Sequence, residues 1–419
     1  MPHTLAQKLL QMHTDEPVST PGQIVECRLT GVLANDITGP LAIKSFRSMG
    51  ADKVFDKEKI FLVMDHYTPQ KDIASANQVM ISRRFAKEMG ITHYYEGGNA
   101  GVEHALLPEK GLVKPGDLFI GADSHTCTYG GLGAFSTGLG STDIACGMAL
   151  GRLWFKIPPT LLVEISGSMP EWVRGKDLIL RLIGMIGVDG ALYRALEFAG
   201  STLSEIGIED RLCMANMAIE AGAKCGLFPS DSLTVRYCLD HGVKDPVEIC
   251  PDADAEYEKV IPMDVTGMEP VVACPHLPAN VKPVSSLKDV CIDQVVIGSC
   301  TNGRLSDMRD AAAVLKGRKV AQGVRCIIIP ATPDVWRQSM NEGLFDIFSD
   351  AGCIVSAPTC GPCLGGYMGV LGDGERCIST SNRNFRGRMG SLNSELYLSN
   401  PCVAAASAVA GTITHPGQL

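Results

Sequence analysis

Short apolar runs alternate with helix-like segments along most of the chain, and this alternation restricts its fold more than any other feature. The apolar runs have the length and composition of strands buried on both faces of a sheet. They lie at residues 59–64, 117–121, 160–165, 294–298, 325–329 and 353–357. Segments with helical spacing or many small residues lie at 73–88, 142–153, 176–185, 201–220 and 306–315. Strands that alternate with helices predict an α/β protein.

The chain length predicts several domains. A chain of 419 residues corresponds to about three domains of ordinary size. Residues 245–286 interrupt the alternation, because an acidic segment is followed there by five prolines. Such a composition is typical of a crossing between domains. We therefore expect α/β domains at residues 1–160, 161–282 and 283–419, the second of which ends in the proline-rich crossing.

Charge and cysteine content exclude several classes of protein. The net charge is −9, which argues against nucleic acid or an anionic membrane as the main partner. No secretory signal and no apolar run of membrane-spanning length is visible, so we expect a cytoplasmic protein.

The 16 cysteines are scattered apart from Cys360 and Cys363. In a long chain without a signal, most of them are expected to be reduced, buried thiols.

Polar clusters follow directly on four of the predicted strands. These clusters are Asp65-His66, Asp123-Ser124-His125, residues 299–302 and residues 359–363. Ligands in open α/β sheets bind beyond the carboxyl ends of the strands. Turn chemistry alone accounts for any one such cluster, but not for four that carry His, Asp and Cys together. The sequence therefore predicts one site built from several strand ends.

The pair Cys360 and Cys363 has three possible explanations. A C-x-x-C after a strand is typical of a redox dithiol, but the glycines that follow disfavour the helix on which such a dithiol sits. A structural zinc needs four ligands, and no second C-x-x-C is present. An iron–sulfur cluster uses C-x-x-C together with a distant cysteine, for which Cys300 at the end of a predicted strand is the candidate.

Other residues indicate that the ligand carries carboxylates. Arg383, Arg386 and Arg388 lie close together in an otherwise acidic protein, and arginine binds carboxylates through its planar fork. Glu220 lies in an apolar context, where a raised pKa would suit it to acid–base chemistry or where it would accept backbone donors. Glu103 and His104 form a further carboxylate–histidine pair in the sequence.

Four motifs together resemble the signatures of the aconitase superfamily. They are Gly121-Ala-Asp-Ser-His-Thr, Gly298-Ser-Cys-Thr-Asn, Thr359-Cys-Gly-Pro-Cys and Ser381-Asn-Arg-Asn-Phe-Arg-Gly-Arg388, in the family's order. The resemblance implies three α/β domains around a [4Fe-4S] cluster, which has three cysteine ligands and one open iron. It also implies that the family's fourth, swivelling domain is absent from this chain.

The resemblance carries roles over to individual positions. Three positions match the cluster ligands: Cys300, Cys360 and Cys363. Six match acid, base or hydrogen-bonding groups beside the iron: Asp65, His66, His104, Asp123, His125 and Glu220. Six match or lie near substrate-binding positions: Asn35, Ser124, Asn216, Asn382, Arg383 and Arg388.

The absence of the fourth domain, which the resemblance implies, predicts a partner subunit and limits the reactions to be expected. That domain supplies the family's catalytic serine, so the resemblance implies a separate small subunit in a heterodimer or heterotetramer. Two-chain members interconvert small hydroxy acids by removing and re-adding water. The activity expected first is that of 3-isopropylmalate dehydratase in leucine biosynthesis. Homoaconitase and hydratases for dimethylmalate or citraconate are the alternatives, and Asn35 and Thr128 differ from the residues of citrate-specific members.

Two functions of other classes remain as alternatives. A thiol oxidoreductase would use Cys360 and Cys363 and contain no iron. A non-catalytic RNA-binding role, found in some relatives of aconitase, is disfavoured by the acidic charge.

Overall fold

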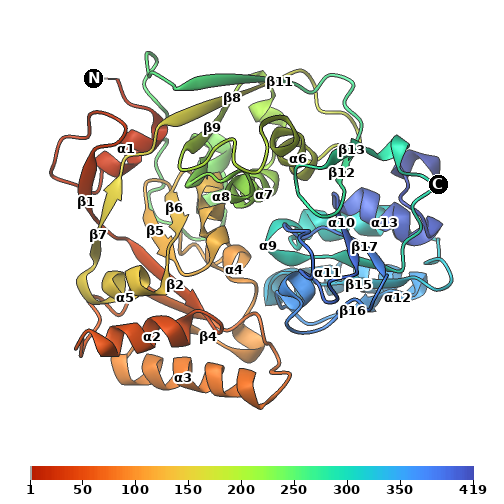
Figure 1. Ribbon diagram of the computed structural model, residues 1–419, viewed down its shortest axis with the longest axis horizontal. Coiled ribbons are helices and arrows are strands. Elements are labelled where there is room, and N and C mark those ends of the chain that lie inside the picture. Colours follow the sequence, from red (N-terminus) through yellow and green to blue (C-terminus); the bar gives the residue numbers. More distant parts are fainter. Residues whose placement is uncertain (1) are drawn as a thin grey trace.

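The computed structural model describes residues 2–419, in which three large sheets are packed among helices (Figure 1). The first is a five-stranded parallel sheet with the order β4-β3-β2-β5-β6. Its strands are β2 (Gly31–Asn35), β3 (Ile60–Val63), β4 (His93–Tyr95), β5 (Leu118–Gly121) and β6 (Phe135–Gly138). The predicted runs at 59–64 and 117–121 correspond to β3 and β5.

Helices cover both faces of this first sheet. One face packs against α2 (Gly39–Ser48), α3 (Ile73–Met89) and α5 (Ser141–Leu150). Ile60 and Leu62 point to that face, whereas Phe61 and Val63 point to the other, where α4 (Glu103–Glu109) packs. This alternation has the period of two that strands impose, and both faces are apolar because both are covered.

The second sheet has four parallel strands in the order β10-β9-β8-β11. They are β8 (Thr160–Ser166), β9 (Ala195–Ala199), β10 (Cys225–Leu227) and β11 (Lys259–Asp264). Helix α6 (Gly175–Ile186) contributes Leu178 and Leu182 to its core, together with Phe198 of β9. Helix α7 (Ile208–Asn216) lies beside α6 and leads towards the site described below.

The third sheet has seven strands in the order β13-β12-β18-β17-β14-β15-β16. Strands β14 to β18 pair in parallel, and β12 pairs antiparallel with β13 and β18. The strands are β12 (Val271–Ala273), β13 (Val281–Pro283), β14 (Gln294–Ile297), β15 (Arg325–Ile328), β16 (Ile354–Val355), β17 (Arg376–Ser379) and β18 (Glu395–Leu398). Its helices are α10 (Leu305–Leu315), α11 (Pro333–Asn341), α12 (Leu344–Ala351) and α13 (Pro401–Ala410).

Shorter elements connect these layers. The remaining helices and strands are α1 (Leu5–Gln11), β1 (Ile24–Arg28), β7 (Arg152–Lys156), α8 (Ser232–Asp240) and α9 (Ser299–Asn302). The 3₁₀ turns are η1 (Gly97–Asn99), η2 (Ser124–Leu132), η3 (Ser201–Glu205), η4 (Met217–Ala221), η5 (Val284–Ser286), η6 (Gly361–Leu364) and η7 (Pro416–Gln418).

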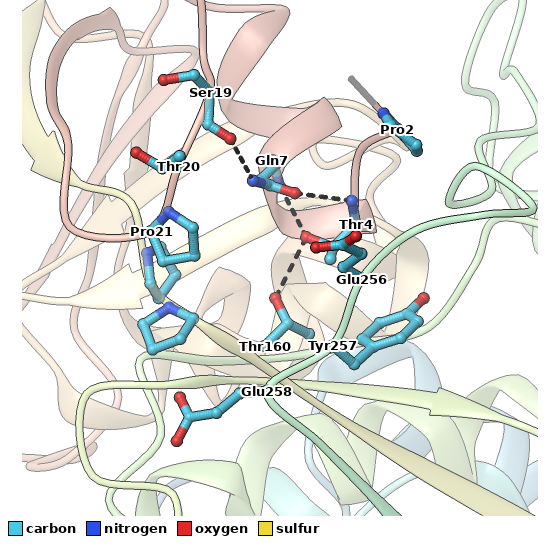
Figure 2. A pocket seen from close by; sticks show the side chains of 12 residues that line it. Pro2, Thr4, Gln7, Ser19, Thr20, Pro21, Thr160, Glu256, Tyr257 and Glu258 are labelled. Atoms are coloured by element: carbon cyan, nitrogen blue, oxygen red, sulfur yellow. Dashed lines mark hydrogen bonds between the residues drawn. The ribbon is translucent and has the colours of Figure 1, made fainter.

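Helix α1 is fastened to the second sheet by buried polar contacts. Glu197 of β9 accepts a hydrogen bond from the Ala6 backbone N–H at 2.9 Å. Figure 2 shows the pocket beside this contact, where the Thr4 and Thr160 hydroxyls lie 3.2 Å apart. Gln7 donates there to the Ser19 carbonyl. The N-terminal segment is therefore part of the packed structure.

Three details differ from the sequence expectations. The helix expected at 142–153 ends earlier, because Gly151 adopts φ +67° and begins the turn into β7. The proline-rich crossing supplies β12 and β13 to the third sheet, and the domain boundaries themselves stay a prediction. Not all thiols outside the proposed ligands are buried, since Cys250 and Cys291 are exposed.

None of the helices in residues 2–419 is long and apolar enough to cross a membrane.

Candidate active site

The carboxyl ends of strands from the first and third sheets meet at one small cavity. Asp65 and His66 follow β3, Asp123 follows β5, Cys300 follows β14 and Asn382 follows β17. The cavity is lined by Asp65, His66, Val102, Glu103, His104, Asp123, His125, Cys300, Cys360, Cys363, Asn382 and Arg388. We call it the site cavity.

Backbone contacts hold the first and third sheets together at the site cavity. The Val102 N–H donates to the Ala331 carbonyl at 2.7 Å. The Cys360 N–H donates to the Asp65 carbonyl at 2.9 Å, and the Thr359 hydroxyl donates to the same oxygen at 2.8 Å. The cysteine loop is therefore positioned directly against the Asp65-His66 turn, although the two are far apart in the sequence.

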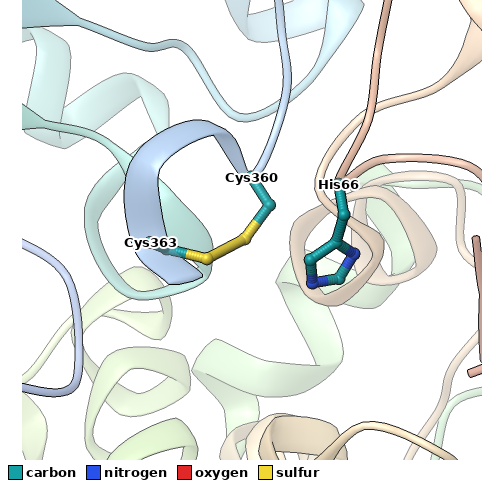
Figure 3. A group of neighbouring side chains, drawn as sticks. All are labelled: His66, Cys360 and Cys363. Carbon is teal, nitrogen blue, oxygen red and sulfur yellow. A yellow bond between two sulfur atoms is a disulfide. The ribbon is translucent and has the colours of Figure 1, made fainter. Parts of the chain in front are cut away.

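The three predicted cluster cysteines lie on the wall of the site cavity. Cys300, Cys360 and Cys363 are all buried, and Cys360 and Cys363 form a disulfide beside His66 (Figure 3). Burial raises the pKa of the Cys300 thiol to about 11. The Asn382 side-chain N–H donates to the Cys300 sulfur at 3.2 Å. Once the disulfide is reduced by two electrons, a cluster would take all three sulfurs as thiolates, and the donor from Asn382 suits a charged sulfur.

His66 lies between two carboxylates. Its Nδ1 is 2.7 Å from Asp65 Oδ1 and 3.4 Å from Asp36 Oδ1. Burial by itself would lower the pKa of His66, but the charges and hydrogen bonds of Asp65 and Asp36 outweigh it and raise this pKa well above its ordinary value. The imidazole is therefore held protonated and can donate a proton towards the site cavity.

Asp123 connects two further histidines. Its Oδ1 is 3.2 Å from His104 Nε2, 3.3 Å from His125 Nδ1, and accepts the His125 backbone N–H at 2.7 Å. Burial opposes ionisation of Asp123, but hydrogen bonds from both histidines hold its pKa well below the usual range. Burial lowers the pKa of His104, which favours its neutral form. Asp123 is thus an ionised group that orients both rings.

The pKa of the Glu103 carboxyl group is shifted in the opposite direction from that of Asp123. Glu103 Oε1 accepts from the Asn35 side-chain N–H at 3.0 Å and lies 3.5 Å from His104 Nε2. Burial, together with the nearby charges of Asp65 and Asp123, raises the pKa of Glu103 well above its ordinary value. The site cavity therefore combines a carboxyl group with a lowered pKa, Asp123, and one with a raised pKa, Glu103.

A second chain of contacts runs from His125 outwards. His125 Nε2 is 2.9 Å from Glu220 Oε1, and Arg383 Nε donates to the same oxygen at 2.7 Å. Arg383 also donates to the Ser124 hydroxyl at 3.0 Å. Glu220 comes from η4 of the second sheet's domain, so this chain connects side chains from all three parts of the molecule.

Several buried polar atoms at the site cavity lack a partner. Among residues 2–419 these include Glu103 Oε2, Asn382 Oδ1 and Arg388 Nε. Burial and the neighbouring charge of Arg383 lower the pKa of the Arg388 guanidinium. Unsatisfied groups of this kind are costly inside a protein, so their concentration here points to a polar ligand. Together with three sulfur donors, the surroundings fit an iron–sulfur cluster and an anionic substrate.

The structure brings the fifteen predicted residues into one connected group. Ten of them line the site cavity, and five lie behind it and are joined to it by hydrogen bonds, directly or through one another: Asn35, Ser124, Asn216, Glu220 and Arg383. Asn216 is joined through its side-chain oxygen, which accepts from Asn382 at 3.2 Å. Their individual roles stay predictions.

Sequence reasoning missed Asp36 and did not place Glu103 among the site residues. Asp36 accepts the backbone N–H groups of His66 at 3.2 Å and of Tyr67 at 2.7 Å. The signal was present, because Asp36 directly follows the end of β2 and thus repeats the strand-end pattern of the other clusters.

Comparison with known proteins decides the family. A model of the Aconitase family (aconitate hydratase) matches residues 7–290 and 280–411. The chain belongs to the aconitase family. The resemblance seen in the sequence and the predicted α/β fold class are both confirmed.

Several relatives match over their full length. A 3-isopropylmalate dehydratase large subunit of Desulfovibrio desulfuricans is 68% identical over 420 residues, with 100% of both chains covered. That of Nitratidesulfovibrio vulgaris is 67% identical over 419 residues, again with 100% of both covered. That of Acetivibrio thermocellus is 58% identical over 416 residues and covers 99% of each chain.

One solved structure supports the fold. The aconitase X of Thermococcus kodakaraensis, in its holo-form, superposes with a TM-score of 0.52. The two chains are 14% identical, and the match covers 93% of each. This similarity concerns the fold alone.

Proposed function

We propose that the chain is the large subunit of 3-isopropylmalate dehydratase, a hydro-lyase of leucine biosynthesis. Relatives with this name match it over their full length at 58–68% identity. The observation that carries the proposal is the site cavity, which joins three cysteines, three carboxylate-paired histidines and a buried arginine. This combination suits the removal and re-addition of water on a substrate that carries carboxylates.

Cys300, Cys360 and Cys363 would hold one [4Fe-4S] cluster in each large subunit. Three protein ligands for four irons leave one iron open. When bound, such a cluster supplies a Lewis acid for the hydroxyl and a carboxylate of the substrate. The sulfur donors and the unpartnered polar atoms around them support this assignment.

Arginine and asparagine side chains would bind the substrate. Arg388 has a buried Nε without a partner and can form charge-assisted hydrogen bonds to a carboxylate. Arg383 is held by Glu220 and Ser124, so its remaining donors have a fixed direction. Asn382 is fixed between Cys300 and Asn216. Asn35 acts one step behind, through Glu103.

The histidines would transfer protons to and from the departing hydroxyl group. His66 is held protonated by Asp65 and Asp36, which suits it to donate a proton as the hydroxyl leaves as water. His104 is neutral and oriented by Asp123. His125 is connected to Glu220, so a proton can pass between these two groups. In the reverse direction the same groups activate the water that is added back.

A small subunit would complete the active site. The name of the relatives implies such a partner, and we place the base that removes the substrate's carbon-bound proton on its swivelling domain. The two chains would form a heterodimer or heterotetramer. We assign the enzyme to the cytoplasm, where the 14 free cysteines outside the Cys360–Cys363 pair suit a reducing compartment.

The direct test is the activity of the two-subunit enzyme. The chain is produced with the small subunit encoded by the same organism, purified without oxygen, and given 3-isopropylmalate. We expect the unsaturated dehydration product and 2-isopropylmalate to form. Preferential turnover of homocitrate, dimethylmalate or citraconate would replace the substrate assignment. Dithiol–disulfide exchange by Cys360 and Cys363 in a protein free of iron would contradict the proposal altogether.

A further inference from the structure

A lysine on the second sheet's domain is buried directly behind the site cavity. Lys176 lies in the first turn of α6 and is fully buried. Its Nζ donates to the Thr301 hydroxyl at 3.1 Å, to the Thr380 carbonyl at 2.9 Å and to the Ser381 carbonyl at 2.8 Å. A fully buried lysine is rare and requires an explanation.

The hydrogen-bond pattern favours the charged form of Lys176. The two carbonyl oxygens can only accept. The Thr301 hydroxyl donates its own proton to the Thr380 carbonyl, so it too accepts from Lys176. Three acceptors use all three hydrogens of an ammonium group, whereas a neutral amine has only two to give. These three contacts favour the ammonium form of Lys176 and oppose the effect of burial, which lowers the pKa of this lysine.

This charge has no carboxylate partner. Within residues 2–419, no carboxylate oxygen lies within 4.0 Å of its Nζ. A buried charge without a counter-charge is strongly destabilising. Burial lowers the pKa of Lys176, and the more distant charges of Asp307 and Asp177 only partly oppose this, so a further negative group nearby would stabilise its ammonium form.

Both segments that Lys176 contacts lead directly into the site cavity. Thr301 follows Cys300, and Ser381 precedes Asn382. Asn382 in turn donates to the Cys300 sulfur at 3.2 Å. Lys176 therefore fixes, from behind, the two strand ends that carry a proposed cluster ligand and a proposed substrate ligand.

We propose that Lys176 is a positioning residue that supplies the fixed counter-charge of the anionic, thiolate-ligated cluster and ties the Cys300 and Asn382 strand ends together. The inference rests on the proposed function, because the negative group it requires is the cluster. Helix α6 would thus help to retain the cluster and to set its reduction potential.

The test compares Lys176→Gln and Lys176→Arg with the unmodified full-length chain. Each is first treated with a dithiol reductant, which converts the Cys360–Cys363 disulfide to thiols, and is then reconstituted without oxygen using ferrous iron and sulfide. Lys224→Gln is the control, because Lys224 is a partly buried lysine next to Tyr193 and away from the site cavity. The readouts are the rate of iron loss to a chelator and the midpoint reduction potential of the cluster.

Lys176→Gln removes the charge but keeps a hydrogen-bond donor. We expect it to lose iron about tenfold faster or more, since breaking a buried charge pairing is costly. Its midpoint potential should shift to a more negative value, because the added electron loses a nearby positive charge. Lys176→Arg and Lys224→Gln should keep the potential of the unmodified chain.

Thr301→Val tests separately whether Lys176 positions the Cys300 and Asn382 strand ends. This variant also provides a test if Lys176→Gln does not fold. It should speed iron loss while leaving the potential unchanged, because the charge remains. The counter-charge role of Lys176 would be refuted if the midpoint potential is unchanged in folded Lys176→Gln. It would also be refuted if the potential shifts in Lys176→Arg as far as in Lys176→Gln. Unchanged iron loss in Thr301→Val would overturn the positional role. An unmodified chain that takes up no iron would instead refute the proposed function.

Discussion

Glu197 should make the protein less stable as the pH rises through neutrality. This carboxyl group is buried in β9, where it accepts the Ala6 N–H, and its Oε2 lies 3.2 Å from the Tyr257 hydroxyl. Burial raises the pKa of Glu197 to about 7. Its ordinary value in the unfolded chain is about 4.3. The folded state therefore binds the proton more tightly than the unfolded state does.

The size of the effect follows from this difference in pKa. A group whose folded pKa is raised contributes stability below its unfolded pKa and loses it as the pH passes the folded pKa. One pKa unit corresponds to about 1.4 kcal/mol. Between pH 5 and pH 8, ionisation of Glu197 should lower the free energy of unfolding by about 2–3 kcal/mol.

The assay compares Glu197→Gln with the unmodified chain in urea unfolding at pH 5 and pH 8. Glutamine keeps an oxygen acceptor for Ala6 and does not ionise, so the variant should lose about 2–3 kcal/mol less on going from pH 5 to pH 8. Glu164→Gln, an exposed position on β8, is the control and should behave like the parent. Equal pH dependence in Glu197→Gln and the parent would show that Glu197 does not ionise in this pH range.

Two further predictions concern catalysis. Asp123→Asn removes the ionised group that orients His104 and His125, so kcat of the two-subunit enzyme should fall by about 10²–10⁴-fold; a kcat within threefold of the parent would argue against that role. Arg383→Lys replaces the fork held by Glu220 and Ser124 with a single ammonium, and should lower kcat/KM by about ten- to a hundredfold, measured by steady-state kinetics with folding checked by circular dichroism. Unchanged kcat/KM in a folded Arg383→Lys enzyme would remove this arginine from the substrate site.

Much of the fold could be predicted because the strands are buried on both faces. The apolar runs at 59–64 and 117–121 predicted β3 and β5. Helical spacing predicted the bounds of α3 and α10 to within a residue or two. Strand order could not be predicted, since it depends on contacts between distant segments. Strands β12 and β13 are short and flanked by prolines, and they form because the edge of the third sheet is available to pair with them.

The site was predictable at strand ends and less so behind them. Strand-end position alone indicated His66, Asp123 and Cys300 as members of one site. The pairing of His104 with Asp123 could not be foreseen, because 18 residues of chain separate them and only the packing of α4 against η2 brings them to 3.2 Å. Lys176 gave no signal in the sequence, because its role depends on burial against segments beside the third sheet that are distant in the sequence.

The most direct measurement is the amount of iron and acid-labile sulfide bound per chain after purification without oxygen. We expect about four of each in the parent, as a [4Fe-4S] cluster requires. Cys300→Ala should lose most of this iron, whereas Cys402→Ala, which removes an equally buried thiol of α13, should keep it. A folded parent without iron, or Cys300→Ala with the full amount, would contradict the assignment of the three cysteines.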